Sequence, residues 1–71
     1  MEGLTVGRMV HYVNHDGAHR AAVVVGVVEK ERGYADLYVF PIPLGWAEQV
    51  YSCVAFSEEP KNGTWHWIEK A

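Results

Sequence analysis

The chain has 71 residues, one of which is a cysteine. Six Lys and Arg stand against nine Asp and Glu, which gives a formal net charge of −3. These values predict one short domain, exclude an intramolecular disulfide and, because the basic residues are scattered, disfavour nucleic acid as the main partner. A hydrophobic content of 49% is typical of a folded domain and excludes a disordered one.

The first residues, 1–4, carry neither the basic segment nor the apolar segment of a signal peptide. The longest apolar run, 21–28, is too short to cross a bilayer as a helix. We therefore expect a cytoplasmic protein of the host cell that has no membrane contact. In that compartment Cys53 is expected to be a reduced thiol.

The first half of the chain predicts two strands joined by a tight turn. Residues 8–13 are rich in β-branched and aromatic side chains, and 14–17 end in Asp-Gly, which tolerates the positive φ of a tight turn. Residues 21–29 hold five valines, which favour a strand over a helix. Apolar residues on both faces predict a central strand, with a bend or bulge at Gly26.

The second half predicts three more strands with turns between them. A charged hairpin loop at 30–33 precedes a strand at 34–40, whose side chains alternate between apolar and polar. Prolines at two positions then interrupt the ladder, so a loop is expected that runs through Trp46 to about Gln49. The remaining strands are expected at 50–56 and, after the Asn-Gly turn at 62–63, at 64–68.

Five short strands, most of them linked by hairpins, predict an all-β fold. A closed barrel removes the sheet edges and lets a small core fill the interior. The strand order and the position of the Pro-rich loop are those of a small five-stranded SH3-like barrel, which we expect to occupy residues 1–71 as one domain. An OB-like barrel is the alternative, although it usually needs longer strands.

Three segments resemble a family of small uncharacterised proteins of actinobacterial phages and prophages. The segments are Val6–Val13, which contains Val-His-Tyr-Val, Arg20–Val24, and the tail Gly63–Trp67 with the sequence Gly-Thr-Trp-His-Trp. The family usually follows the second Trp with Pro, where this chain has Ile68, and residues 30–59 depart further from its pattern. The resemblance implies a phage accessory protein and brings no established activity with it.

A weaker resemblance is to the plasmid-encoded type II dihydrofolate reductases, which are SH3-like barrels that form a tetramer around a central pore. Their pore segment Val-Gln-Ile-Tyr is similar to Glu48-Gln49-Val50-Tyr51 at three positions. The lysine that this family uses in its first strand is absent here, where Tyr12 falls at roughly the same place. The resemblance therefore supports the fold more than a reductase activity.

The four histidines and the cysteine offer little chemistry that the sequence itself can establish. His11, His15 and His19 are four residues apart, but Asn, Asp and Gly between them oppose the helix that would align them. In a hairpin, His11 and His19 would instead face each other across the turn. No zinc motif is present, and Cys53 in an apolar strand is expected to be a small hydrophobic residue. We expect no metal site, no cofactor and no catalytic residue.

The aromatic side chains are the strongest indication of function, because their number exceeds what a barrel of this size easily buries. In an extended tail Trp65 and Trp67 would share one face and His66 the other. We expect one of these tryptophans to be structural and the other to lie at a surface or subunit interface. The expected ligand-binding residues are Trp46, Gln49, Tyr51, Trp65, His66 and Trp67.

We therefore expect a phage or prophage accessory protein that binds through exposed aromatic residues without catalysis and forms a homo-oligomer. Its partner would be a host protein or a small molecule. One alternative is a nucleotide binder that sequesters a host signal, with His66 or Arg20 holding the ligand. The other is an enzyme similar to the type II dihydrofolate reductases, with a pore at the oligomer axis formed by Gln49, Val50 and Tyr51.

Overall fold

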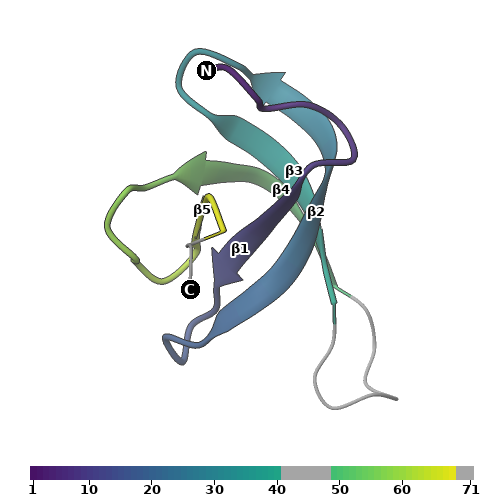
Figure 1. The fold of residues 1–71 in the computed structure, drawn as a ribbon. Helices are drawn as coiled ribbons and strands as arrows, with labels where there is room; N and C mark the ends of the chain where they lie inside the picture. The colour runs from purple at the N-terminus through teal and green to yellow at the C-terminus, as the bar shows by residue number, and fades with distance from the viewer. Residues whose placement is uncertain (41–48, 69–71) are drawn as a thin grey trace.

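Five β-strands form the regular structure of the described residues, 1–40 and 49–68, in the computed structural model (Figure 1). No helix occurs in these two ranges. The sequence analysis predicted each strand, and the all-β expectation is confirmed. The strands are β1 (Met9–Val13), β2 (His19–Glu29), β3 (Tyr34–Val39), β4 (Gln49–Phe56) and β5 (Thr64–His66).

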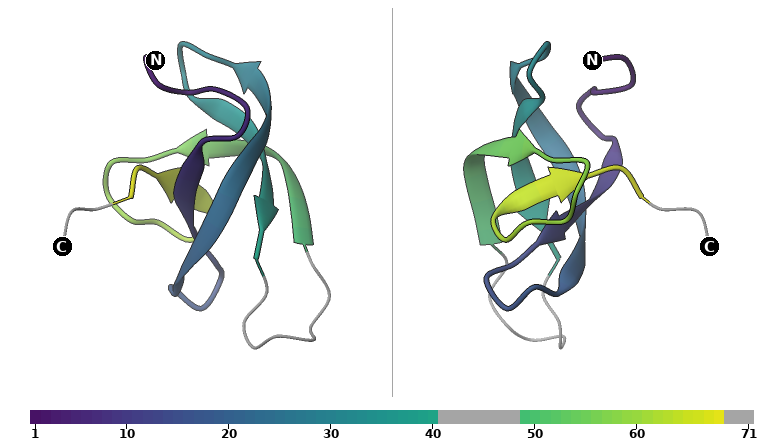
Figure 2. Two further views of the ribbon diagram at one scale, coloured as in Figure 1. Left: turned by 45° about the vertical axis from the view of Figure 1, so that its right-hand side comes forward. Right: turned by 90° about the vertical axis from the view of Figure 1, so that its left-hand side faces the viewer.

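The strands close into a barrel in the order β1-β2-β3-β4-β5. Successive strands from β1 to β4 pair antiparallel, and β5 closes the barrel by pairing antiparallel with β1 and parallel with β4. Figure 2 shows the short β5 lying between the ends of these two strands. The predicted five-stranded SH3-like barrel is therefore confirmed.

The core fills the barrel with the inward-facing side chains of all five strands. In β3 the alternation that the sequence predicted is observed, because Ala35, Leu37 and Val39 are buried between half-buried neighbours. Trp65 is the largest of the fully buried side chains. The core cluster consists of Leu4, Val10, Tyr12, Ala22, Val24, Ala35, Leu37, Val39, Val54 and Trp65.

The long strand β2 changes register with β3 between Val24 and Gly26, where the sequence predicted a bend or bulge. A methyl group at Gly26 would lie 3.0 Å from Oδ2 of Asp36 on β3. The other carboxylate oxygen of Asp36 accepts a 2.8 Å hydrogen bond from the backbone N–H of Cys53 on β4. The absence of a side chain at Gly26 therefore leaves room for a carboxylate that links β3 to β4.

Each strand differs from the sequence prediction at one end, by one residue in β1, β3 and β4 and by two residues in β2 and β5. Strand β2 begins at His19, two residues early, because His19 already pairs with Val13 across the turn. Strand β5 ends at His66, since β1 pairs only with Trp65 and His66. The predicted loop at 41–48, which includes Trp46, lies outside the described residues. In the described part of the chain, no helix has the length and apolar character that a membrane crossing requires.

Candidate functional site

Trp65 is part of the core and cannot contact a ligand. Its side chain is fully buried, and its Nε1 donates a 2.7 Å hydrogen bond to the backbone carbonyl of Gly33. The ring of Phe56 packs edge-on against it, with the ring centroids 4.9 Å apart. The closing strand turns this ring into the barrel, so the structure places Trp65 in the core as the structural tryptophan of the tail and not at a surface.

Trp67 is the tail tryptophan that remains partly exposed. Its ring is nearly perpendicular to that of Trp65, with a centroid distance of 4.9 Å and an interplanar angle of 84°. The guanidinium carbon of Arg8 lies 5.1 Å from the ring centroid, which is a cation–π distance. The two tryptophans thus lie side by side, Trp65 inside the barrel and Trp67 packed against the core with its ring partly exposed.

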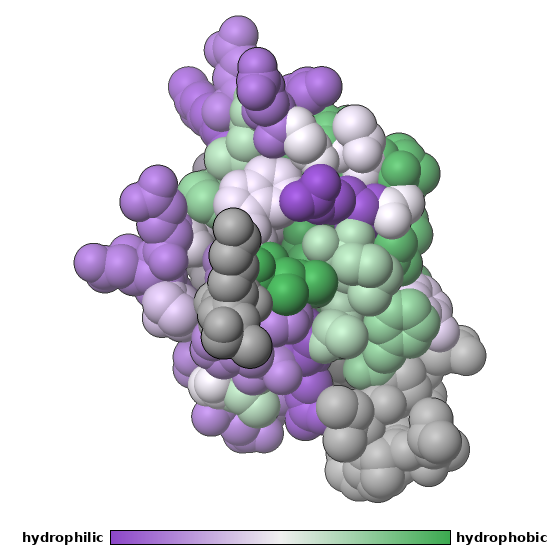
Figure 3. All heavy atoms as spheres, in the orientation of Figure 1, coloured by the Kyte–Doolittle hydropathy of each residue, from purple (hydrophilic) through white to green (hydrophobic). Residues whose placement is uncertain are grey.

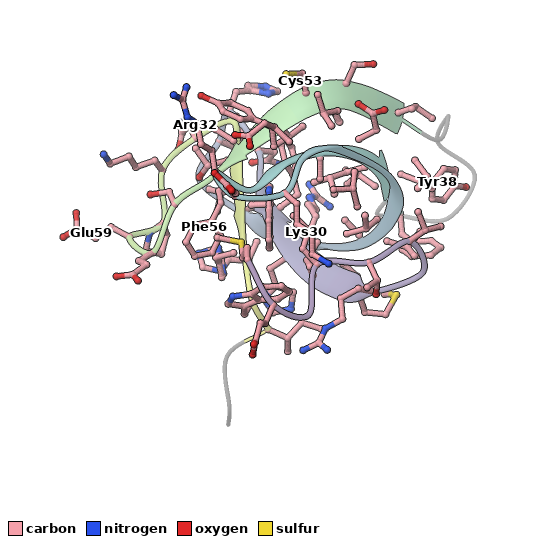
Figure 4. The ribbon with its side chains drawn as sticks, turned by 90° about the horizontal axis from the view of Figure 1, so that it is seen from above. Lys30, Arg32, Tyr38, Cys53, Phe56 and Glu59 are labelled. Carbon is pink, nitrogen blue, oxygen red and sulfur yellow. The ribbon has the colours of Figure 1, made fainter. Side chains whose placement is uncertain are left out.

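A pocket of ≈ 230 Å³ opens beside Trp67 and is lined by Phe56, Glu58, His66 and Trp67. Two aromatic rings give it apolar walls, while an exposed carboxylate and an imidazole supply polar groups. Its volume is below the ~300–1,000 Å³ of sites for drug-sized ligands, so it suits a single ring or one side chain. Figure 4 shows Phe56 at the side of the barrel opposite Tyr38.

His66 also belongs to a second cluster, on the outer face of β1, β2 and β5. It pairs with His11 in the β1–β5 register, and the two ring centroids lie 5.6 Å apart. His19, at the start of β2, lies 4.8 Å from His66 and 6.1 Å from His11 by the same measure. The fourth histidine, His15, lies in the turn with its side chain 90% exposed, next to Asp16.

Of the remaining predicted site residues, Tyr51 has a described side chain, and it is not among the residues that line the pocket. Tyr51 is half-buried and stacks on Tyr12, with ring centroids 4.8 Å apart and an angle of 21°. Burial, with a smaller contribution from the nearby phenol of Tyr51, raises the pKa of Tyr12 above its ordinary value. Gln49 begins β4 and pairs with Val39, and Trp46 lies outside the described residues.

Only Val50 in the segment that resembles the reductase pore has a described side chain that is largely exposed, at 65%. Tyr51 instead turns toward the core, where it packs against the buried cluster. Of the two described side chains of this segment, one apolar group therefore faces outward and one aromatic ring packs inward.

The sequence analysis did not predict Phe56, Glu58 and Arg8 as site residues, nor His11 and His19 as neighbours of His66. Their proximity depends on how β5 closes the barrel, because His66 meets His11 through the β1–β5 pairing and Phe56 meets Trp65 through the β4–β5 pairing. The signal that was available in the sequence was the turn at 14–17, which predicted that His11 and His19 face each other. In the structure they are diagonal neighbours, because His11 pairs with Ala21 and His19 pairs with Val13.

Comparisons with known proteins identify no family for this chain: no protein-family model, no curated protein and no solved structure matches it. The function is therefore inferred from the chemistry of the pocket and of the surface around it.

Proposed function

We propose that this protein is a small binding module without catalysis of its own, and that the pocket between Trp67 and Phe56 is its binding site. The observation that carries the proposal is the position of Trp67, which packs against the core and lines the pocket while its ring remains partly exposed. Aromatic rings of this kind provide a large contact area at a low cost in side-chain entropy.

The pocket favours a flat or narrow apolar group with a polar edge. Phe56 and Trp67 supply apolar walls, and Glu58 and His66 lie beside them as polar groups. A volume of ≈ 230 Å³ accepts one such group, which is either an aromatic or aliphatic side chain of a protein partner or the ring of a small molecule. SH3 domains bind proline-rich segments of their protein partners in grooves lined by aromatic side chains.

The test is an NMR titration of the ¹⁵N-labelled protein with indole, adenosine and a short proline-rich peptide as probes. We expect at least one probe to shift the amide signals of Phe56, His66 and Trp67. Trp67→Ala should abolish the shifts, and Phe40→Ala should keep them, because Phe40 is an exposed aromatic residue that contacts Tyr38 on β3. Shifts that survive Trp67→Ala, or no shifts at millimolar probe, would contradict the proposal.

A nucleotide is the second candidate ligand, and the contact between Arg8 and Trp67 favours it. The guanidinium lies 5.1 Å from the ring centroid, so a base stacked at Trp67 would have a cationic group within reach of its phosphate. In that case AMP should bind more tightly than adenosine, and Arg8→Gln should remove the difference while adenosine binding persists. Equal affinities of the two ligands would favour the protein partner.

We also propose that the protein self-associates through the outer face of its sheet. Met9, Val23, Tyr38 and Val50 form a continuous row across β1 to β4, since each is the register partner of the next. Figure 3 shows hydrophobic residues gathered on this side of the molecule, over β2. Burial of such a row against a second copy would add to the small core of a 71-residue chain.

Sedimentation velocity over a range of concentrations tests the self-association. The wild-type protein should sediment as an oligomer that Val50→Lys dissociates. Val6→Lys is the matched control, because Val6 is 67% exposed in the segment before β1 and is not part of the row. A wild-type monomer at all concentrations would contradict the proposal.

The phage or prophage origin is supported by the sequence resemblance, and the genes beside this one would test it.

A further inference from the structure

Three of the four histidines lie together on the outer face of the barrel, although they come from three different strands. Of the described residues, His11, His19 and His66 form a group in which each offers a nitrogen atom within 4.8 Å of the others. His66 is buried, His11 is half-buried and His19 is exposed, so the cluster opens to solvent on one side. It lies outside the lining of the pocket except for His66, which both share.

The strand pairing holds this cluster in place. His11 and His66 are direct register partners, and His19 pairs with Val13, two residues along β1 from His11. Residues two apart in a strand share a face, so all three imidazoles point outward. The group is therefore built on paired strands rather than on the turn, which is the kind of support that fixes metal ligands in position.

We propose that His11, His19 and His66 bind a divalent first-row transition-metal ion such as Zn²⁺. Neutral imidazole is a borderline ligand that suits Zn²⁺, Co²⁺, Ni²⁺ and Cu²⁺, whereas Mg²⁺ and Ca²⁺ require oxygen ligands. Three histidines that leave a fourth position open form a known type of zinc site. The proposal goes beyond the binding pocket and does not depend on it.

The distances agree with a site that needs only small side-chain movements. With Zn–N bonds of about 2.0–2.1 Å, the nitrogens of a tetrahedral site are about 3.3 Å apart. The present separations of up to 4.8 Å exceed this value by an amount that rotations about χ1 and χ2 can remove. Neither His11 nor His19 is fully buried, so the open side of the cluster leaves room for small rotations of these two rings, while His66 lies in the closing strand.

Titration of the full chain, purified without a histidine tag, with Zn²⁺ alone in a calorimeter tests the proposal. We expect saturable binding of one ion per chain. Co²⁺ should give the visible absorption of a nitrogen-bound ion, and zinc should displace it. At a free zinc concentration about 100 times the Kd, the melting temperature should rise by roughly 10 °C or more.

Matched variants identify the ligands. His11→Ala and His19→Ala should each weaken zinc binding by about 100-fold or more. The reason is that mutation of a residue that only hydrogen-bonds a metal ligand already lowers metal affinity by up to about 100-fold. His15→Ala and Cys53→Ser should bind as the wild type does, because both residues are exposed and lie outside the cluster. His66→Asn is informative only if its NMR spectrum shows a folded barrel, so the two more exposed histidines carry the test.

No saturable zinc binding, or binding that His11→Ala and His19→Ala retain, would overturn the proposal. So would binding that is lost in His15→Ala or Cys53→Ser, since the ion would then be held by the turn or by the thiol. Loss of binding in the two cluster variants together with wild-type binding in the two controls would establish the site.

Discussion

The Nε1 of Trp65 donates a 2.7 Å hydrogen bond to the carbonyl oxygen of Gly33, and so joins the closing strand to the β2–β3 hairpin 32 residues away. Trp65→Phe removes this donor and leaves a cavity beside a buried carbonyl. We expect the free energy of unfolding to fall by about 2–3 kcal/mol. Urea unfolding followed by circular dichroism measures it. Trp67→Phe is the control and should cost less than about 1 kcal/mol, because that ring is partly exposed.

Gly33 itself should be the glycine that tolerates substitution least. Its φ is +80°, and an added Cβ would lie 2.7 Å from Cβ of Phe56. Gly33→Ala therefore combines backbone strain with a clash, and we expect a loss of at least about 2–3 kcal/mol. Gly17→Ala separates the two effects, since Gly17 also has a φ of +80° but its nearest atom would be 3.9 Å away. If thermal unfolding shows that the two variants lose the same stability, the structure relieves the clash at Gly33.

Tyr12 should make the stability of the protein fall at alkaline pH. Burial and the neighbouring phenol of Tyr51 raise the pKa of Tyr12 in the folded state. Below the unfolded pKa of about 10 both states hold the proton, and above it the unfolded chain releases its proton first, so unfolding becomes easier. Urea unfolding between pH 8 and pH 11 should therefore show a steeper decline for the wild type than for Tyr12→Phe. Parallel declines would exclude Tyr12 as the cause.

The local features of this fold follow from the sequence, and the long-range ones do not. The valines of β2, the alternation in β3 and the turn glycines each act within a few residues, and they predicted the strands and the register shift at Gly26. The two tryptophans of the tail were expected on one face, and their rings are in contact. Local patterns of this kind are sufficient for a barrel of short hairpins.

The candidate sites were harder to predict because they depend on barrel closure. The pairing of His11 with His66 joins residues 55 positions apart in the sequence, and no local pattern sets that register. The burial of Trp65 depends likewise on the acceptor at Gly33 and on the ring of Phe56 from β4. A tail with two tryptophans indicates that aromatic surface must be covered, but the fold decides which ring is inside.

Cys53 is a strand position at which we expect glycine to be more stable than alanine, whereas in a regular strand glycine is usually the less stable of the two. It is the one residue other than glycine, among the described ones, with a positive φ, at 54°. The register of β3 with β4 shifts beside it, and its N–H is held by the carboxylate of Asp36 at 2.8 Å. This hydrogen bond keeps the backbone in a conformation that costs a side chain about 1–2 kcal/mol.

Cys53→Gly should therefore be more stable than Cys53→Ala by about 1 kcal/mol, although glycine in a regular strand is less stable than alanine by about 0.5–1 kcal/mol. Both variants lack the thiol, so the comparison isolates the backbone. Urea midpoints measured at pH 7 under reducing conditions give the difference. Ser52→Gly and Ser52→Ala form the control pair, since Ser52 is exposed in the same strand without a positive φ, and there alanine should be the more stable. If alanine is also the more stable residue at position 53, the left-handed conformation of Cys53 costs the fold nothing.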